Sequence, residues 1–432
     1  MLPYTKHEIT NEDIEAVTEV MRRGALTKGS KIEEFEAALC AYTGCKHAVV
    51  MSSGTAALHA AAFALETKRA IVPAMSFVAT ANCARYVGAE VNIVDVEDKH
   101  LHLDKWLVND FFRLEQTPPT GNTTVITCDF AGVQCPMNDF AYLKNKHGFR
   151  LLVDGCHSFG IKPSPHADIT CYSFHPAKLI TTGEGGVAVT NDALLAGAMR
   201  RFRDHGIDTP QALRDASNQI NYDVRMLGFN YRMTDMQAAL GISQLKRADQ
   251  YLAARKVVRK WYDESMRNTD LFTLLDATDS ANHLCVVRFE NRYVRDFVYK
   301  YMRDLKYGVT LHYPVISQFT AYKGPVTPVA QHASDHTLSL PLYPAMTHAD
   351  VVKVLANVRQ AITNYTHHSH KSQIVQGVAS SGGFEKQYLS PAYVQGKSLA
   401  PTPHLGGRPL DPLNHYHTLD DRYFDTLDKS KK

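Results

Sequence analysis

The chain has 432 residues, and its 47 Lys and Arg nearly balance its 44 Asp and Glu, so the formal net charge is +3 with the 21 histidines neutral. This balance argues against the basic excess of nucleic-acid-binding proteins, and the length predicts about three structural units. No apolar run approaches the length of a membrane span, and the N-terminus lacks the apolar core of a secretory signal. We therefore expect a cytoplasmic globular protein that binds neither nucleic acid nor membrane.

The first part of the chain predicts a large α/β domain over residues 1–253, because short apolar runs alternate there with segments of helical period. A first helix is expected to begin at Thr10, which forms a capping box with Asp13, and to end at Gly24. The expected strands are His47–Met51, Ala70–Pro73, Val91–Val94, Thr124–Cys128, Arg150–Asp154, Ile169–Phe174 and Gly186–Thr190. Further helices are expected at Ile32–Tyr42, Thr55–Leu65, Ala79–Val87, Asp139–Lys146, Asp192–Phe202 and Thr234–Ala253.

The pattern changes after residue 253. Residues 254–366 predict a smaller α+β domain, with strands near His283–Phe289 and Val309–Tyr313, a helix near Tyr293–Leu305 and a last helix from His348. In residues 367–432 the apolar periodicity fails, which predicts a poorly ordered extension or one that depends on a partner. The histidines at 367, 368 and 370 in this extension are expected to bind metal only adventitiously.

The eight cysteines show neither a C-x-x-C pair nor the Cys/His spacing of a zinc site. We therefore expect reduced thiols, and the sequence predicts no metal site.

The most informative segment surrounds Lys178, which lies between an apolar strand and the Gly-rich turn Gly183–Gly186. Lysine is rarely buried without a partner or a reaction to perform, and a desolvated lysine can form a Schiff base with an aldehyde such as pyridoxal phosphate (PLP). Taken alone, Lys178 is better explained as an ordinary surface lysine, because exposed lysines are common.

Two further segments favour the PLP interpretation. Asp154 ends a buried strand, where its carboxylate can pair with the pyridine nitrogen of PLP, and His157 can contact the phenolic oxygen. The Ser53-Gly54-Thr55 segment begins a helix, whose free N–H groups form a phosphate cradle. Simple helix or turn capping remains an alternative for Asp154 and Ser53, and simple core packing for Phe77, whose ring can stack on a cofactor.

Taken together, these segments resemble the nucleotide-sugar aminotransferases of the DegT/DnrJ/EryC1/StrS family. The similarity covers residues 2–361 and is greatest to the transaminases that act on the UDP-linked 4-keto sugar of pseudaminic acid synthesis. The motifs that carry it are Ala25–Gly29, Ser53–Leu58, Ser76–Asn82, Asp154–Gly160, Ser173–Gly186, Gly228–Asp235, Leu311–Pro314 and Leu338–Pro344.

The resemblance implies an aspartate-aminotransferase fold, with a large, mostly parallel sheet, and assigns roles to individual residues. Lys178 would bind PLP covalently, with Asp154 and His157 as the other catalytic residues. Phe77 would stack on the PLP ring, and the remaining cofactor contacts would come from Ser53, Gly54, Thr55, Ser173 and Asn230. Asn230 would reach the cofactor of a neighbouring subunit, which implies a homodimer with shared active sites. Nucleotide-sugar contacts are expected from Thr27, Lys28, Gly29, His175, His312 and Tyr313.

The implied reaction is a transamination in which glutamate is the amino donor and a nucleotide-linked 4-keto-6-deoxy sugar is the acceptor. The presence of Lys178, which family members that act as dehydratases replace with His, favours transamination. Alternative acceptors are GDP-linked 4-keto sugars, which give perosamine, and dTDP-linked 3-keto sugars. A scaffold protein with a retired PLP domain and a PLP-dependent lyase remain alternatives of another class. The extension at 367–432 departs from the family pattern and leaves room for an additional partner.

Overall fold

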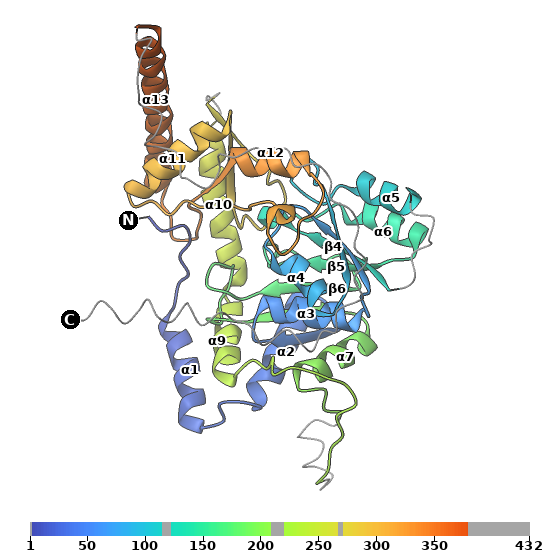
Figure 1. The fold of residues 1–432 in the computed structure, drawn as a ribbon. Coiled ribbons are helices and arrows are strands. Elements are labelled where there is room, and N and C mark those ends of the chain that lie inside the picture. Colours follow the sequence, from blue (N-terminus) through green and yellow to red (C-terminus); the bar gives the residue numbers. More distant parts are fainter. Residues whose placement is uncertain (1, 115–121, 209–219, 267–270, 379–432) are drawn as a thin grey trace, which may run out of the picture. The chain divides into compact units, whose positions relative to one another are not determined.

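A seven-stranded sheet forms the centre of the computed structural model, which describes residues 2–114, 122–208, 220–266 and 271–378 (Figure 1). Its strand order is β1-β7-β6-β5-β4-β2-β3, in which β2 to β6 run parallel, whereas β7 is antiparallel to both β6 and β1. This architecture confirms the predicted α/β class. The strands are β1 (His47–Met51), β2 (Arg69–Pro73), β3 (Glu90–Val94), β4 (Thr123–Cys128), β5 (Arg150–Asp154), β6 (Ile169–Ser173) and β7 (Gly186–Thr190).

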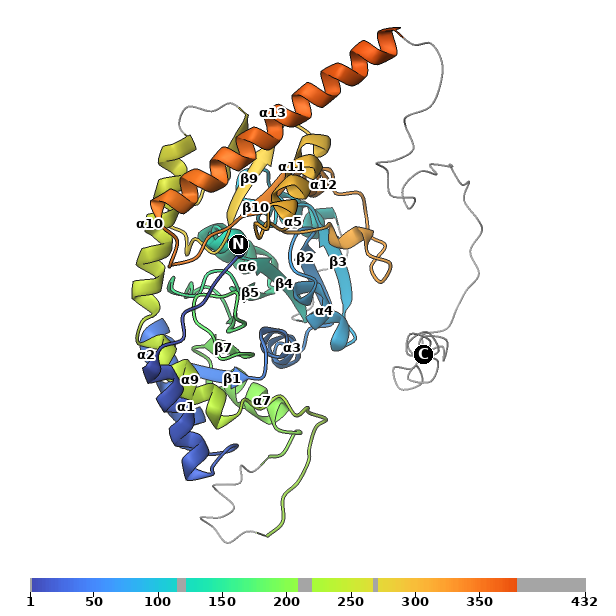
Figure 2. The same cartoon turned by 90° about the vertical axis from the view of Figure 1, so that its left-hand side faces the viewer.

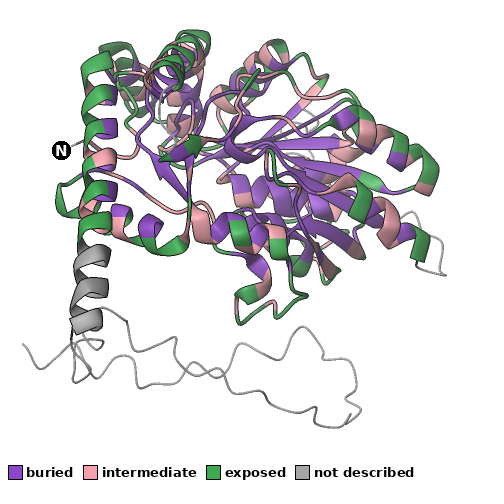
Figure 3. Cartoon of the chain, turned by 90° about the horizontal axis from the view of Figure 1, so that it is seen from above, coloured by how far each residue is buried: buried purple, intermediate pink, exposed green. Residues whose placement is uncertain are grey.

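Helices cover both faces of this sheet, because its central strands are apolar on both sides and must be shielded from water. Figures 1 and 2 show α3 and α4 on one face and α5 and α6 on the other, and Figure 3 shows that burial concentrates in the strands. The helices of this part are α1 (Asn11–Arg23), α2 (Ser30–Thr43), α3 (Gly54–Ala64), α4 (Ala79–Tyr86), α5 (Lys105–Leu114), α6 (Met137–His147), α7 (Ala193–Arg203), α9 (Asp235–Leu245) and the short 3₁₀ helix η1 (Phe130–Gly132).

A second, three-stranded sheet has the order β10-β9-β8, with antiparallel pairing throughout. Its apolar side chains pack with those of α10, α11 and α13 into a separate core cluster. The elements of this part are α10 (Ala248–Met266), β8 (Phe272–Leu274), β9 (Cys285–Phe289), α11 (Arg292–Asp304), η2 (Ile316–Gln318), α12 (Pro328–His336), β10 (Thr337–Leu340) and α13 (His348–Val378).

Strand register brings the ends of several strands together on one side of the large sheet. The parallel strands β4, β5 and β6 end there, and Ser173 at the end of β6 lies opposite Gly186, which in turn lies opposite Met51 at the end of β1. Consequently the chain leaves β1, β5 and β6 on the same side of the molecule, which is where open α/β sheets bind ligands.

Most predicted strands and helices agree with the structure to within one or two residues. The capping box of Thr10 and Asp13 is present, and Gly24 ends α1 in the left-handed conformation at φ 76°.

The predicted single helix Thr234–Ala253 is wrong, because α9 and α10 are separated by a turn at residues 246–247. The turn is stabilised at Arg247, whose guanidinium binds the buried carboxylate of Asp13 at 2.6 and 2.7 Å.

The predicted strand Val309–Tyr313 is also wrong. Only Thr310 pairs with a strand, in an isolated bridge to Ser339 of β10. Val309 is buried in the core cluster of the small sheet, so its apolar character reflects side-chain packing and not strand pairing.

Helix α5 was not predicted, although Val108 and Phe112 form its buried face at a helical spacing of four residues.

The predicted boundary at residue 253 lies inside α10, and residues 1–369 form one compact unit. At the other predicted boundary, α13 continues past Thr366 to Val378. The remainder of the predicted extension, residues 379–432, lies outside the described residues.

Among the helices of the described chain, none combines the length and apolarity that a membrane span requires.

Candidate active site

The buried carboxylate of Asp154, which is 4% exposed, lies at the carboxyl end of the central strand β5. Thr80 Oγ1 on α4 donates a hydrogen bond of 2.6 Å to its Oδ2, and the Cys156 N–H donates one of 3.2 Å to its Oδ1. Within the described residues, Asp154 forms no ion pair. A buried carboxylate of this kind requires a positive partner to offset its desolvation.

The turn after β5 presents His157, which is buried and packs against four other rings, those of Phe130, His283, His312 and Tyr313. Its Nε2 shares a hydrogen bond of 3.0 Å with the hydroxyl of Tyr313, whose ring is stacked on it at 6.0 Å. Its Nδ1 is buried without a hydrogen-bond partner among the described residues. Burial, together with the nearby Lys178 and His312, lowers the pKa of His157 well below its ordinary value, so the ring is neutral at pH 7.

Lys178 lies in the loop between β6 and β7 and is half-buried. The loop is held in place because the Lys178 N–H donates to the His175 carbonyl at 2.8 Å and the Thr182 N–H donates to the Phe174 carbonyl at 3.0 Å. Burial lowers the pKa of the Lys178 amine, although the nearby Cys156 and Asp154 oppose the shift. The structure therefore brings Lys178, Asp154 and His157 into one electrostatic cluster, as their sequence motifs predicted.

The start of α3 lies beside the end of β6. Ser53 is the N-cap of the helix, and its hydroxyl accepts the Ala56 N–H at 3.1 Å. A Cβ on Gly54 would lie only 2.8 Å from the Cβ of Ser173, so this approach requires glycine. The N–H groups of Gly54 and Thr55 at the helix start have no intrahelical acceptor, which leaves them available to an anion.

Phe77 and Asn230 are exposed. The Phe77 ring is 56% exposed and lies 6.1 Å from the ring of Tyr313, so one face remains available for stacking. Asn230 pairs through its backbone with Asp204 in an isolated bridge, and its side chain forms no hydrogen bond with the described residues. Both side chains could make their predicted cofactor contacts from these positions, and these contacts stay predictions.

The predicted sugar-binding segment Thr27-Lys28-Gly29 is an exposed loop whose shape depends on one buried carboxylate. Asp235, at the start of α9, accepts the Gly29 N–H at 2.9 Å. A Cβ on Gly29 would lie 2.6 Å from the same carboxylate. Lys28 forms an ion pair of 3.5 Å with Asp204, the residue whose backbone pairs with Asn230.

The remaining residues predicted to contact the sugar, His312, Tyr313 and His175, lie in two different parts of the site. His312 and Tyr313 belong to the ring cluster around His157, where the Nδ1 of His312 shares a hydrogen bond of 2.9 Å with the hydroxyl of Ser339. Burial, followed by the charge of Lys178, lowers the pKa of His312 to about 3. His175 is exposed at the start of the Lys178 loop, where its Nδ1 accepts the Ala177 N–H at 3.1 Å.

Sequence reasoning missed a buried arginine beside this cluster. Arg255 on α10 is 2% exposed and donates to backbone carbonyls, of which the nearest is Leu342 O at 3.1 Å. It forms no ion pair with the described residues, and burial lowers its pKa to about 10. Arg255 and Lys178 line the same cavity of about 220 Å³, together with Lys6, His7, Glu8, Leu179, Gln244, Tyr251, Pro344 and Ala345.

Thr80, Asp129 and His283 were also missed. Asp129 holds the turn that carries His157, because its carboxylate accepts the Ser158 hydroxyl at 2.6 Å. Burial raises the pKa of the Asp129 carboxyl to about 6, against the opposing effect of this hydrogen bond. The His283 ring lies 4.3 Å from the His157 ring. These contacts join residues far apart in the sequence, and local motifs carry no signal for them.

Comparison with known proteins agrees with this geometry. The model of the DegT/DnrJ/EryC1/StrS aminotransferase family matches residues 7–359. A UDP-4-amino-4,6-dideoxy-N-acetyl-β-L-altrosamine transaminase from Campylobacter jejuni is 33% identical over 366 residues, which cover 81% of this chain and 94% of the relative. The spore coat polysaccharide biosynthesis protein SpsC of Bacillus subtilis is 31% identical over 386 residues, covering 84% of this chain and 97% of the relative.

Two solved structures are similar over nearly their whole length. PseC of Helicobacter pylori, an aminotransferase involved in pseudaminic acid biosynthesis, has a TM-score of 0.77 and 26% identity over 84% of this chain and 99% of that protein. The sugar aminotransferase Spr1654 of Streptococcus pneumoniae, in its pyridoxamine phosphate form, has a TM-score of 0.78 and 25% identity over 84% and 100%. The chain therefore belongs to the DegT/DnrJ/EryC1/StrS family and is a PLP-dependent sugar aminotransferase.

Proposed function

We propose that this aminotransferase transfers the amino group of glutamate to the 4-keto carbon of a UDP-linked 4-keto-6-deoxy sugar of the pseudaminic acid type. The observation that carries this substrate assignment is the 33% identity to the Campylobacter transaminase, which extends over 94% of that relative. A GDP-perosamine synthase from Caulobacter vibrioides is 34% identical, but only over 55% of this chain. The UDP-linked acceptor is therefore the better supported of the two.

The environment of Asp154 fits the cofactor. Its buried carboxylate forms no ion pair among the described residues, and a protonated pyridine nitrogen would supply one. The surrounding thiols add no charge to this site, because burial raises the pKa of Cys128, Cys156 and Cys171 well above the ordinary value and keeps them neutral. The unpartnered Nδ1 of His157 offers a hydrogen-bonding position for a further polar atom of the cofactor.

The phosphate end of the cofactor fits the start of α3. We assign its binding to the N–H groups of Gly54 and Thr55 and the hydroxyl of Ser173, because a helix N-terminus carries partial positive charge and free donors. The Ser53 hydroxyl is already used as the helix cap, so its contribution is to position Gly54 and Thr55.

Lys178 is assigned the covalent attachment of the cofactor and the transfer of a proton. When bound, PLP supplies an electron sink that stabilises negative charge at the Cα of the amino donor. The lowered pKa of Lys178 makes its free amine a better proton acceptor at neutral pH than an exposed lysine, so Nζ can take the Cα proton and later return one. The cavity beside it is lined by the basic side chains of Lys6, Lys178 and Arg255 and by one carboxylate, Glu8, which suits an anionic substrate.

We also infer a homodimer in which Asn230 enters the active site of the partner subunit. Asn230 is exposed, and the residues before it include a run of exposed apolar side chains. Such a concentration of apolar surface is typical of a protein–protein interface. The exposed apolar residues of this run are Ile220, Tyr222, Val224, Leu227 and Phe229.

The substrate assignment can be tested with a panel of keto sugars. Glutamate as donor is combined with UDP-linked and GDP-linked 4-keto-6-deoxy sugars and with a dTDP-linked 3-keto sugar, and products are identified by mass spectrometry. We expect kcat/KM for the UDP-linked N-acetylated 4-keto sugar to exceed the others by about tenfold or more, because a site that hydrogen-bonds the uracil and N-acetyl groups would leave polar groups unpaired with the competitors. A preference for the GDP or dTDP sugar would contradict the assignment while leaving the aminotransferase chemistry intact.

The phosphate cradle can be tested by Gly54→Ala. The added Cβ would lie 2.8 Å from Ser173 Cβ, so the start of α3 or the end of β6 must move, and we expect the dissociation constant for PLP to rise by about tenfold or more. PLP binding is measured by absorbance after dialysis. Gly197→Ala on α7 is the matched control, because its Cβ meets only the end of the Arg201 side chain at 3.5 Å. Unchanged PLP affinity in a folded Gly54→Ala protein would exclude the proposed cradle.

Shared active sites can be tested by mixing two inactive variants. Lys178→Ala and Asn230→Ala subunits are each expected to have low activity. A mixed dimer contains one site with both residues intact, so an equal mixture that has exchanged subunits should recover about one quarter of wild-type activity. Activity is measured before and after exchange, with each variant alone as the control. If exchange is demonstrated by mass but activity does not rise, Asn230 acts within its own subunit or not at all.

A further inference from the structure

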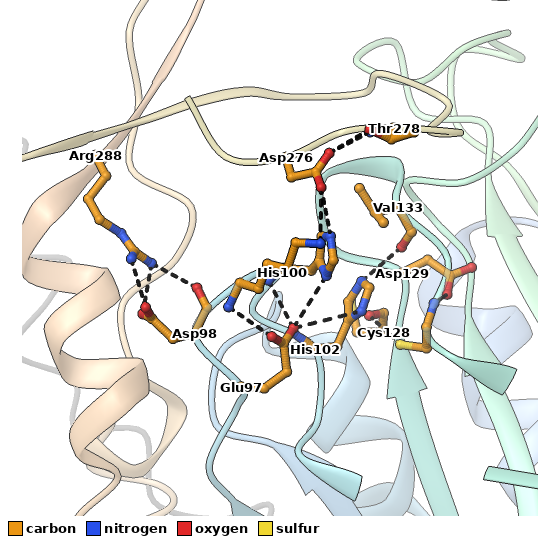
Figure 4. A network of polar contacts seen from close by, with 12 residues as sticks. Glu97, Asp98, His100, His102, Cys128, Asp129, Val133, Asp276, Thr278 and Arg288 are labelled. Atoms are coloured by element: carbon orange, nitrogen blue, oxygen red, sulfur yellow. Dashed lines mark hydrogen bonds and ion pairs between the residues drawn. The ribbon is translucent and has the colours of Figure 1, made fainter. Parts of the chain in front are cut away.

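The turn after β3 contains a group of metal-binding side chains that transamination does not use. Glu97, His100 and His102 each direct one ligand atom toward a common point, and these atoms lie within 4.8 Å of one another (Figure 4). Their backbone is fixed, because the Glu97 carboxylate Oε1 accepts the N–H groups of His100 at 2.9 Å and His102 at 3.1 Å, and Oε2 accepts that of Lys99 at 2.8 Å. The three side chains are therefore presented by a rigid turn.

The two imidazoles are oriented in the same way. His102 is 2% exposed, and its Nε2 is held at 3.0 Å by the carbonyl oxygen of Val133. His100 Nε2 lies 3.6 Å from a carboxylate oxygen of Asp276, which follows β8 in the other part of the chain. When Nε2 carries the proton toward these acceptors, Nδ1 of each ring retains its lone pair. This arrangement of an outer acceptor behind each histidine is the one found around metal ligands.

The two Nδ1 atoms face the same oxygen without bonding to it. Glu97 Oε1 lies 3.9 Å from His100 Nδ1 and 4.0 Å from His102 Nδ1, and both distances are too long for a hydrogen bond. In a tetrahedral site with bonds of about 2.0–2.1 Å, adjacent ligand atoms lie about 3.4 Å apart. A tetrahedral site would therefore require Oε1 and the two Nδ1 atoms to move closer together, by about half an ångström for each Glu97–His pair.

The charges of the group also suit a cation. Two carboxylates, those of Glu97 and Asp276, lie within 4.0 Å of the histidine rings. The Thr278 N–H and hydroxyl donate to the Asp276 carboxylate at 2.9 and 2.7 Å, which fixes its position. Lys99 pairs with Asp276 at 3.3 Å and partly neutralises it.

We propose that Glu97, His100 and His102 bind a divalent transition metal of the Zn²⁺ class through Oε1 and the two Nδ1 atoms. Asp276 and the Val133 carbonyl orient the histidines from the outer shell. A set of two imidazoles and one carboxylate favours Zn²⁺ or Co²⁺ over Mg²⁺ or Ca²⁺, which prefer oxygen ligands only. The same three residues line a cavity of about 360 Å³, which gives the metal access to solvent and to a fourth, water ligand.

The expected role of this metal is structural. Glu97 and the histidines follow the edge strand β3, whereas Asp276 follows β8, so the group connects the large sheet with the small one. An ion pair of 3.0 Å between Asp98 and Arg288 of β9 reinforces the same connection. The assignment rests on these contacts alone and does not depend on the identity of the sugar.

The test is titration of the full-length, PLP-loaded protein with Co²⁺ alone, followed by displacement with Zn²⁺. The background carries His367→Ser, His368→Ser and His370→Ser, which removes the histidine tract as a competing site. We expect one equivalent of Co²⁺ with visible absorption of a four-coordinate or five-coordinate ion, and loss of at least tenfold in affinity in His100→Ala and in Glu97→Gln. Glu97→Gln keeps a carbonyl oxygen to accept the backbone N–H groups, so it separates metal binding from loss of the turn.

Two further variants distinguish an oriented site from a general attraction of cations. Asp276→Asn should weaken Co²⁺ about tenfold to hundredfold, because it removes only the outer-shell carboxylate. Lys99→Ala is the matched control in the same turn and should bind Co²⁺ at least as tightly, because it removes a positive charge and no ligand. No Co²⁺ binding in the background, or equal binding in the background, His100→Ala and Glu97→Gln proteins, would overturn the proposal.

Discussion

The buried carboxylate of Asp154 is the constraint on which the active site depends. It lies at the end of the central strand of the large sheet, where water cannot solvate it, and one hydroxyl and one backbone N–H are its recorded donors. An ionised carboxylate in such a position is costly unless a positive group faces it. The cofactor of this family carries that group, so the same feature that would destabilise the empty fold favours PLP binding in one orientation.

The rest of the site follows from the register of the sheet. Because Ser173, Gly186 and Met51 are aligned across β6, β7 and β1, the start of α3 is placed beside the end of β6. Side chains are excluded from this contact, since a Cβ on Gly186 would lie 2.5 Å from the backbone nitrogen of Gly54. Backbone packing in the core thus sets the distance between the Asp154 carboxylate and the start of α3, which we propose to bind the two ends of the cofactor.

The sequence predicts much of this arrangement because its signals are local. Strands β1, β5, β6 and β7 are short apolar runs bounded by turn residues, and Asp154, His157 and Lys178 follow them directly. Contacts between distant segments leave no such signal. Arg255 belongs to α10 but contacts the carbonyl of Leu342, and Thr80 reaches Asp154 from another helix. The turn between α9 and α10 was missed for the same reason, since Arg247 is fixed there by Asp13 near the start of the chain.

The group around Glu97 was also not predicted from the sequence. The absence of paired Cys/His spacing predicted no metal site, yet the outer acceptors of His100 and His102 come from Asp276 and Val133, which are distant in sequence. Folding places them behind the two rings. Thus the active site combines local motifs with a scaffold that only the tertiary structure shows, and the proposed metal group is almost entirely of the second kind.

The central claim is that Lys178 carries the cofactor opposite Asp154. The most direct measurement is borohydride reduction of the PLP-loaded protein, followed by proteolysis and mass spectrometry of the labelled peptide. We expect a single pyridoxyl label on Lys178, and we expect this label to be lost in Lys178→Ala. A label on another lysine of the wild-type protein, or no covalent label in protein shown to contain PLP, would contradict it.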